Sequence, residues 1–195
     1  MRRFNFLFRI VEAVLFLNRR IKSNTIQFKD SFVLLRTKTI NTMQKIIIRK
    51  ARLTDLEKLL SFEQEIIAAE RPFDPTLKQE KIRYYDIEQI ILAPNIEVLV
   101  AEIDLEIVGS GYARIAAAKP YLNHETYAYL GFMHTDMIYR GIGVNSKIIE
   151  SLKDWRRSQN VFELRLDVYN DKASAIKAYE KVGFKKHLIN MRIGL

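Results

Sequence analysis

The sequence predicts an α/β fold built on a mixed sheet, in the order β-α-α-β-β-β-α-β-α-β. Two patterns carry this prediction: short segments alternate apolar and polar residues as strands do, and between them lie segments with apolar residues at helical spacing. Length is the third observation. With 195 residues, 48% of them hydrophobic, the chain can form one well-packed domain plus an extension.

The domain is expected to begin near Met43. Residues 1–42 hold nine Lys or Arg against two acidic residues, whereas residues 43–195 hold 23 basic and 21 acidic residues. We therefore expect residues 1–42 to be a basic and apolar extension, either an amphipathic membrane anchor or a segment outside the native protein. Its apolar run, Phe4 to Leu17, is too short to span a bilayer.

Composition also excludes several classes of function. The domain from residue 43 onward is nearly neutral, so no nucleic-acid partner is expected despite the net charge of +9. A membrane partner is not expected either. The chain has no Cys, which excludes disulfides and thiolate metal sites and fits a cytoplasmic location. No metal site is predicted.

The first half of the domain shows clear boundaries. Thr54 and Asp55 provide an N-cap for the first helix, and the two prolines in Glu70–Pro75 end it. Glycines at 109 and 111, inside a strand, indicate a bulge or the close approach of another group. The expected elements are a strand at 46–50, a helix after Asp55, a second helix from Leu77 to about Asp86, and a hairpin of strands 96–103 and 106–116.

The second half alternates strands and helices. Residues 162–168 alternate strictly, which is typical of a strand, and Gly183 is a suitable residue to end the helix before it. The expected elements are a strand at 126–135, a helix at 142–157, a strand at 162–168, a helix at 173–182 and a last strand from Phe184 to Ile193.

A glycine-rich turn stands where the strand at 126–135 gives way to a helix. Arg140-Gly141-Ile142-Gly143 leaves several backbone N–H groups without partners, and such a turn binds anions, including the phosphates of a cofactor. A Walker loop would need Gly-Lys-Ser/Thr, which is absent, and a dinucleotide fingerprint would need glycine at Ser146. Neither of these phosphate motifs fits.

The turn resembles the acetyl-CoA-binding signature of the GNAT N-acetyltransferase superfamily, Gln/Arg-x-x-Gly-x-Gly/Ala. Arg140, Gly143 and Asn145 take its three positions, and Asn145 departs from the usual Gly or Ala. A second GNAT pattern, Ala-Ile-x-x-Tyr-Glu-Lys-x-Gly-Phe, matches residues 175–184 with Tyr179 at its tyrosine. The resemblance covers about residues 46–195.

This resemblance implies a mostly antiparallel sheet flanked by helices, with acetyl-CoA as the donor in direct acetyl transfer to a primary amine. It implies that Tyr179 is the catalytic acid that protonates the departing thiolate. The phosphates and the pantetheine arm would be held by the glycine turn, the strand before it and a loop residue. These implied cofactor-binding residues are Met133, Thr135, Arg140, Gly141, Ile142, Gly143, Val144, Asn145, Ser146 and Asn170.

The general base and the acceptor stay open. The acceptor pocket is expected between residues 62 and 85, and the acceptor itself is a small-molecule or peptide amine. Homodimer formation is left open. The alternative function is a non-catalytic acyl-CoA-binding homologue, which would need the glycine turn but not Tyr179. Candidate bases are Glu102, Glu125, Tyr129, His134 and Asp136, beside a proton path through water.

Overall fold

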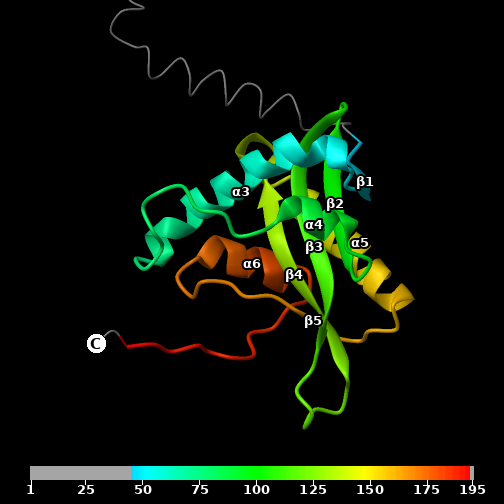
Figure 1. Cartoon of the computed structure of the whole chain (residues 1–195), viewed down its shortest axis with the longest axis vertical. Coiled ribbons are helices and arrows are strands. Elements are labelled where there is room, and N and C mark those ends of the chain that lie inside the picture. Colours follow the sequence, from blue (N-terminus) through cyan, green and yellow to red (C-terminus); the bar gives the residue numbers. More distant parts are fainter. Residues whose placement is uncertain (1–44, 194–195) are drawn as a thin grey trace, which may run out of the picture. The chain divides into compact units, whose positions relative to one another are not determined.

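The computed structural model describes residues 45–193, so the expected extension at residues 1–42 lies outside the described part (Figure 1). Its centre is a five-stranded sheet in the order β1-β2-β3-β4-β5. Strands β1 to β4 pair antiparallel with one another, and β5 runs parallel to β4. The predicted mixed, mostly antiparallel sheet flanked by helices is confirmed.

Helices lie between several of the strands along the chain. Two of the helices, α3 and α5, have fifteen residues each. Within residues 45–193, every helix is too short or too polar to cross a membrane. The elements are β1 (Ile47–Lys50), η1 (Leu53–Asp55), α3 (Leu56–Glu70), η2 (Arg71–Phe73), α4 (Ile87–Leu92), β2 (Ile96–Ile103), β3 (Glu106–Ala117), β4 (Thr126–Thr135), η3 (Met137–Tyr139), α5 (Val144–Ser158), β5 (Leu164–Arg165) and α6 (Ala173–Lys181).

Helix α5 approaches one face of the sheet very closely, at the two glycines of β3. A Cβ atom on Gly109 would lie 2.8 Å from Val144 Cγ1, and one on Gly111 would lie 2.9 Å from Ile148 Cγ2. Both distances are shorter than carbon atoms tolerate, so only glycine lets the start of α5 settle here. The expectation of a close approach at these glycines is confirmed.

The other face of the sheet carries α3 and α4. A buried cluster joins them to the strands, with Phe62 from α3, Ile87 from α4, and Tyr112 and Phe132 from the sheet. Burying these large side chains supplies much of the driving force for packing this layer, at about 1.5–3 kcal/mol for each fully buried side chain. The layer positions the loop between η2 and α4 next to β4.

The second predicted helix is wrong in its position. Residues 77–86 form no helix, and α4 begins only after Asp86, whose side chain accepts a hydrogen bond from Gln89 N at 3.1 Å. Asp86 therefore starts a helix rather than ending one, as its short acidic side chain favours at an N-cap. Backbone groups of the 77–86 segment bond to α3 side chains instead; for example, Gln64 Nε2 donates to Ile82 O at 3.0 Å.

The last two predicted strands are also corrected. Only Leu164–Arg165 of the expected strand 162–168 pairs with β4, because the chain then diverges from that strand. Residues 184–193 form no strand, contrary to the expectation, since no neighbouring strand lies alongside them in the described chain. Their apolar side chains, including Leu188 and Met191, are consequently exposed.

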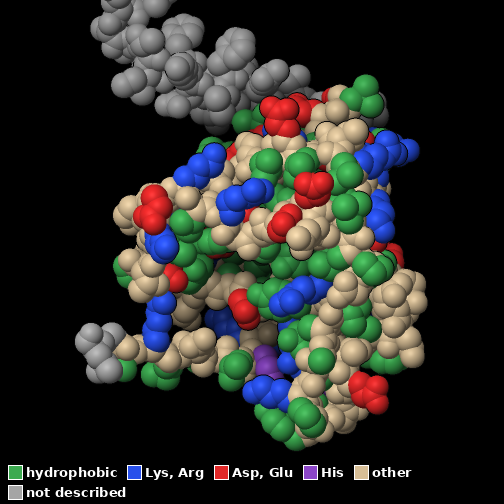
Figure 2. All heavy atoms as spheres, viewed as in Figure 1, with side chains coloured by type: hydrophobic (Ala, Val, Ile, Leu, Met, Phe, Trp, Pro, Cys, Tyr) green, Lys and Arg blue, Asp and Glu red, His purple; other side chains and the backbone are tan. Residues whose placement is uncertain are grey.

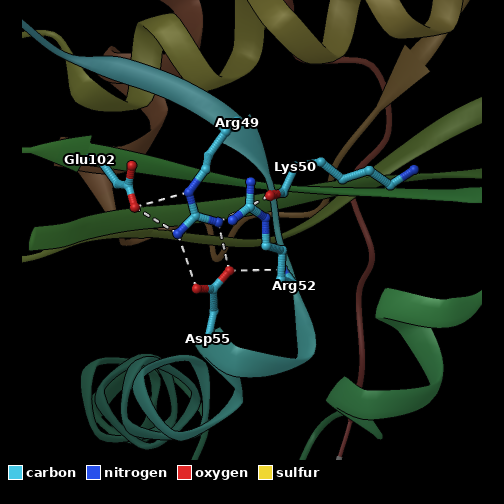
Figure 3. Close-up of polar contacts among 5 residues, drawn as sticks. All are labelled: Arg49, Lys50, Arg52, Asp55 and Glu102. Carbon is cyan, nitrogen blue, oxygen red and sulfur yellow. Dashed lines mark hydrogen bonds and ion pairs between the residues drawn. The ribbon is translucent and has the colours of Figure 1, made fainter. Parts of the chain in front are cut away.

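An arginine ties β1, β2 and η1 together at one end of the sheet (Figure 3). Arg49 Nη1 lies 2.7 Å from Asp55 Oδ2, and Arg49 Nη2 lies 2.6 Å from Glu102 Oε1. Asp55 Oδ2 also accepts a hydrogen bond from Arg52 N at 2.8 Å. The Arg49 guanidinium holds the pKa of the Asp55 carboxyl below its usual value, so the Asp55 carboxylate stays charged beside it.

Candidate functional site

The glycine turn leaves the first turn of α5 open. Gly141 and Gly143 have φ values of 82° and 94°, in the left-handed region that favours glycine. A Cβ atom on either one would meet no atom within 4 Å, so the space over the turn is free. Gly143 is the N-cap of α5, and among the described residues no side chain caps the helix. The N–H groups at its start are therefore available to an anion.

Arg140 connects the turn to the end of β4. Its Nε donates to Thr135 O at 3.1 Å, and the side chain is exposed. The hydroxyl of Thr135 is buried and has no hydrogen-bond partner in the described chain. An orphaned hydroxyl beside an exposed guanidinium and free N–H groups fits a phosphate-bearing ligand, because phosphate oxygens accept from all three kinds of donor.

Strand β4 carries a bulge just before the turn. Phe132 has a φ of 56°, and the register with β3 shifts between Ser110 and Tyr112. Ser110 Oγ donates to Phe132 O at 3.1 Å, which holds the bulge in place. Met133 follows with its side chain over Gly111, on the α5 face. The bulge thus interrupts the ladder where the cofactor arm is expected.

Strands β4 and β5 diverge beside this bulge. They pair only at Ala128 with Leu164 and at Tyr129 with Arg165. At the fork, Tyr129 Oη donates to Asp167 Oδ2 at 3.0 Å. From there on, β4 continues through the bulge to the turn, and no other strand of residues 45–193 pairs with it on this side. The edge of its second half thus offers a place for a ligand to lie along it.

Tyr179 lies on α6, which ends at Lys181, two residues before the left-handed Gly183, with φ of 99°. The phenol ring contacts Phe184 edge-on, with ring centroids 6.0 Å apart. Burial, and then the charge of Glu70, raise the pKa of Tyr179 to about 12. The side chain is therefore a neutral hydrogen-bond donor at physiological pH.

Charged and aromatic groups from distant segments meet near this tyrosine. Lys172 Nζ lies 3.5 Å from Glu70 Oε1, and Tyr169 stacks on Phe73 with centroids 6.0 Å apart. Tyr169 Oη also donates to Asp74 at 3.3 Å. Figure 2 shows this face hollowed between α3 and α4 and the C-terminal segment, with charged side chains of both signs at the border. The end of α3 and the start of α6 thus form one wall.

The candidate bases are scattered. Glu102 is bound by Arg49 and lies on β2, which β3 separates from β4. Asp136 caps η3 by accepting from Ile138 N at 3.3 Å, and Glu125 is exposed in the loop before β4. Each of these three carboxylates has a structural partner or a place in solvent. The remaining candidates, Tyr129 and His134, lie on β4.

His134 is buried against α3. Its ring lies 4.3 Å from that of Phe62, centroid to centroid, and its Nε2 is 3.3 Å from Glu65 Oε2 without hydrogen-bond geometry. Burial lowers the pKa of His134 to about 4, so the imidazole is neutral and its contact with Glu65 is no ion pair at neutral pH. Burial likewise raises the pKa of Tyr129.

Asn170, the loop residue among the expected cofactor-binding residues, belongs neither to the turn nor to β4. It is exposed in the loop before α6, and its Nδ2 donates to the neighbouring Asp171 at 3.1 Å. The sequence also gave no signal for Glu63, a fully buried carboxylate on α3. A glutamate within an amphipathic helix resembles any surface residue until the packing of the 77–86 segment over it is known.

Known proteins resemble this chain over the same region. The sequence profile of the acetyltransferase (GNAT) family matches residues 60–184. The probable N-acetyltransferase camello of Xenopus laevis is 31% identical over 105 residues, which cover 53% of this chain and 46% of that protein. An N-alpha-acetyltransferase of Sulfurisphaera tokodaii is 26% identical over 144 residues, covering 71% and 80%. The chain spans about half the length of the Xenopus relative.

Solved structures share the fold. A mutant of a Bacillus halodurans protein superposes with a TM-score of 0.69 at 19% identity, covering 76% of this chain and 99% of that one. A predicted acetyltransferase from Clostridium acetobutylicum, solved with acetyl-CoA, gives 0.59 at 16% identity, covering 77% and 96%. The profile match spans more than half of the chain, including the glycine turn and Tyr179. This chain therefore belongs to the acetyltransferase (GNAT) family.

Proposed function

We propose that the protein is an N-acetyltransferase that uses acetyl-CoA to acetylate a primary amine. The open, uncapped start of α5 carries this proposal, with free space over Gly141 and Gly143. A helix start of this kind offers several aligned N–H donors and a partial positive charge to a pyrophosphate. The acetyl-CoA and the CoA in solved structures of the same fold support this choice of donor.

The cofactor would lie along the turn and the free edge of β4. The N–H groups from Gly141 to Ser146 would hold the pyrophosphate, and the exposed Arg140 would add a charge-assisted contact. The backbone of Met133 and Thr135 would pair with the pantetheine arm as an added strand would. Acetyl-CoA supplies an activated acyl group, a thioester whose sulfur leaves as a thiolate.

The chain supplies two further groups to the reaction. A backbone N–H at the β4 bulge would donate to the thioester carbonyl oxygen as negative charge develops there, which is worth about 3–4 kcal/mol in enzymes where one such donor was removed. Tyr179 would donate its proton to the departing sulfur. Because its pKa is raised to about 12, the phenol keeps this proton until charge builds up on the sulfur.

The amine would lose its proton to water in this proposal. A base must hold the proton well enough to compete with the amine, and the lowered pKa of His134, about 4, makes its imidazole a poor acceptor. Tyr129 is neutral because burial raises its pKa, and its hydroxyl already donates to Asp167. A chain of water molecules in the open hollow needs no dedicated base.

Calorimetric titration of the full chain with acetyl-CoA is the direct test. We expect saturable binding, followed by CoA release when a panel of primary amines is added. Released CoA can be read with a thiol reagent, because the protein has no cysteine to contribute background. Absence of binding at high micromolar acetyl-CoA would defeat the proposal. Binding without CoA release across small amines and N-terminal or lysine peptides would favour the non-catalytic alternative.

A further inference from the structure

A buried carboxylate fastens the segment before α4 to the middle of α3. Glu63 is fully buried, and its Oε1 accepts hydrogen bonds from both Tyr84 N and Tyr85 N at 2.8 Å. One oxygen thus fixes two consecutive peptide groups that belong to no helix or strand. Neither backbone group could keep its hydrogen bond without this side chain, and leaving such an N–H unpaired would be destabilising.

The charge of Glu63 is only partly balanced. Arg83 Nε lies 3.5 Å from Oε2, but the arginine is more than half exposed, and Oε2 has no hydrogen bond in the described chain. Burying a carboxylate is costly unless it is paired or hydrogen-bonded. The two N–H bonds are therefore the hydrogen bonds that Glu63 makes in the described chain, and they point to a role in placing residues 84 and 85.

Tyr85 is the side chain that this bond places against the sheet. Its ring meets Phe132 and Tyr112 edge-on, with centroids 5.5 and 5.6 Å away. Burial raises the pKa of Tyr85, so its hydroxyl is a neutral hydrogen-bond donor at physiological pH. Its ring lies against Phe132, the residue that adopts a positive φ at the β4 bulge.

This position coincides with the expected site of the thioester. The proposed function puts the pantetheine arm on the backbone of Met133 and Thr135, so the acetyl group would lie next to Phe132. A neutral phenol at that place can donate to an acceptor oxygen while its ring closes the side of the site. We propose that the Tyr85 hydroxyl contacts the acetyl group of acetyl-CoA and that Glu63 is the positioning residue that holds it there.

This inference rests on the proposed function and predicts a difference between two cofactors. Tyr85 would recognise acetyl-CoA but not CoA, because only acetyl-CoA has the carbonyl. Calorimetric titration of the full chain with each cofactor gives the ratio of their dissociation constants. In Tyr85→Phe we expect acetyl-CoA to bind about tenfold more weakly, the effect of one hydrogen bond, and CoA to bind as in the wild type.

Variants of Glu63 separate positioning from simple stability. Glu63→Gln keeps an oxygen that can accept both N–H bonds, so it should keep the wild-type ratio. Glu63→Ala should lose the preference for acetyl-CoA as Tyr85→Phe does. Tyr84→Phe is the matched control: Glu63 holds this neighbour through the same oxygen, yet its hydroxyl has no hydrogen bond in the described chain. In Tyr84→Phe the ratio of the two dissociation constants should not change.

The outcomes separate this inference from the function on which it rests. A wild-type ratio in Tyr85→Phe, with acetyl-CoA still bound, would overturn the inference and leave the proposed function intact. Failure of the wild type to bind either cofactor would remove both. If Glu63→Ala does not fold, Tyr85→Phe and Glu63→Gln still test the inference. Neither of these changes removes a hydrogen bond from the backbone N–H groups of residues 84 and 85. A reduced preference in Glu63→Gln would mean that the charge, rather than the placement, matters.

Discussion

Lys172 Nζ lies 3.5 Å from Glu70 Oε1, joining the residue before α6 to the last residue of α3. The two residues are about a hundred positions apart in the sequence. Glu70 also raises the pKa of Tyr179, after burial. The pair therefore holds the helix that carries the proposed acid against the wall of the proposed acceptor site. It also places the Glu70 carboxylate where it acts on that acid.

Tyr179→Phe should lower kcat by about 100-fold or more, the usual contribution of a general acid, and leave the dissociation constant of acetyl-CoA unchanged. Phenylalanine keeps the ring contact with Phe184 and removes only the hydroxyl group that would donate the proton. Steady-state CoA release and calorimetry measure the two quantities. Tyr169→Phe, which removes a hydroxyl bonded to Asp74 on the same wall, is the control. An unchanged kcat in Tyr179→Phe would take this residue out of the mechanism.

Gly143→Glu should abolish measurable acetyl-CoA binding. The new side chain would fill the open space over the turn and bring a negative charge to the proposed pyrophosphate site. Strain alone is expected to cost about 1–3 kcal/mol of stability, because φ is positive. Gly183→Glu controls for that strain, since Gly183 has nearly the same φ and equally open surroundings outside the turn. Equal affinities in the two variants would mean that the turn is misassigned.

Folding stability should fall as the pH drops from about 6.5 to about 4, in part because of His134. Its folded pKa is lowered to about 4, so the unfolded chain takes up a proton first and is favoured in that window. Above pH 6.5 this contribution is fully present and constant. Urea unfolding at stepped pH measures the slope. His134→Gln cannot titrate and should flatten it; an unaltered slope would place the effect on other groups.

Arg49→Met should destabilise the fold by about 2–3 kcal/mol, because it leaves the Asp55 and Glu102 carboxylates partly buried without their cation. Urea unfolding at neutral pH gives the free energy of unfolding. Lys50→Met is the matched control, since it removes the neighbouring, more exposed cation from Glu97. That change should cost about 0–1 kcal/mol, the usual range for exposed pairs. Similar losses in both variants would show that the burial of the Arg49 cluster carries no extra stability.

Local patterns were sufficient for the centre of the fold. Helix α5 has apolar residues such as Ile148 and Leu152 on one face, and both are fully buried. The glycines of β3 predicted a close approach, which α5 makes. Gly143 and Tyr179 could be assigned roles because their motifs resemble those of a known family. In these segments, local preference and tertiary packing agree.

The errors occur where long-range contacts decide the local structure. A polar helix is expected at residues 77–86, but α3 side chains bond the backbone of this segment and hold it as a loop. Residues 162–168 alternate as a strand does, yet divergence from β4 leaves only two of them paired. Glu63 carries no sequence signal because its burial depends on that loop. Sequence periodicity reports which face of an element is apolar, but it does not report which neighbour is present.

The brevity of the β4–β5 pairing has a consequence for motion. Two paired positions join these strands, whereas eight join β2 to β3. Separating β5 from β4 would therefore break few hydrogen bonds and would leave the rest of the sheet intact. Amide hydrogens on the β5 side of β4 should exchange with solvent far faster than those between β2 and β3. Bound cofactor, lying along the same edge, would slow that exchange and make the fork as protected as the centre of the sheet.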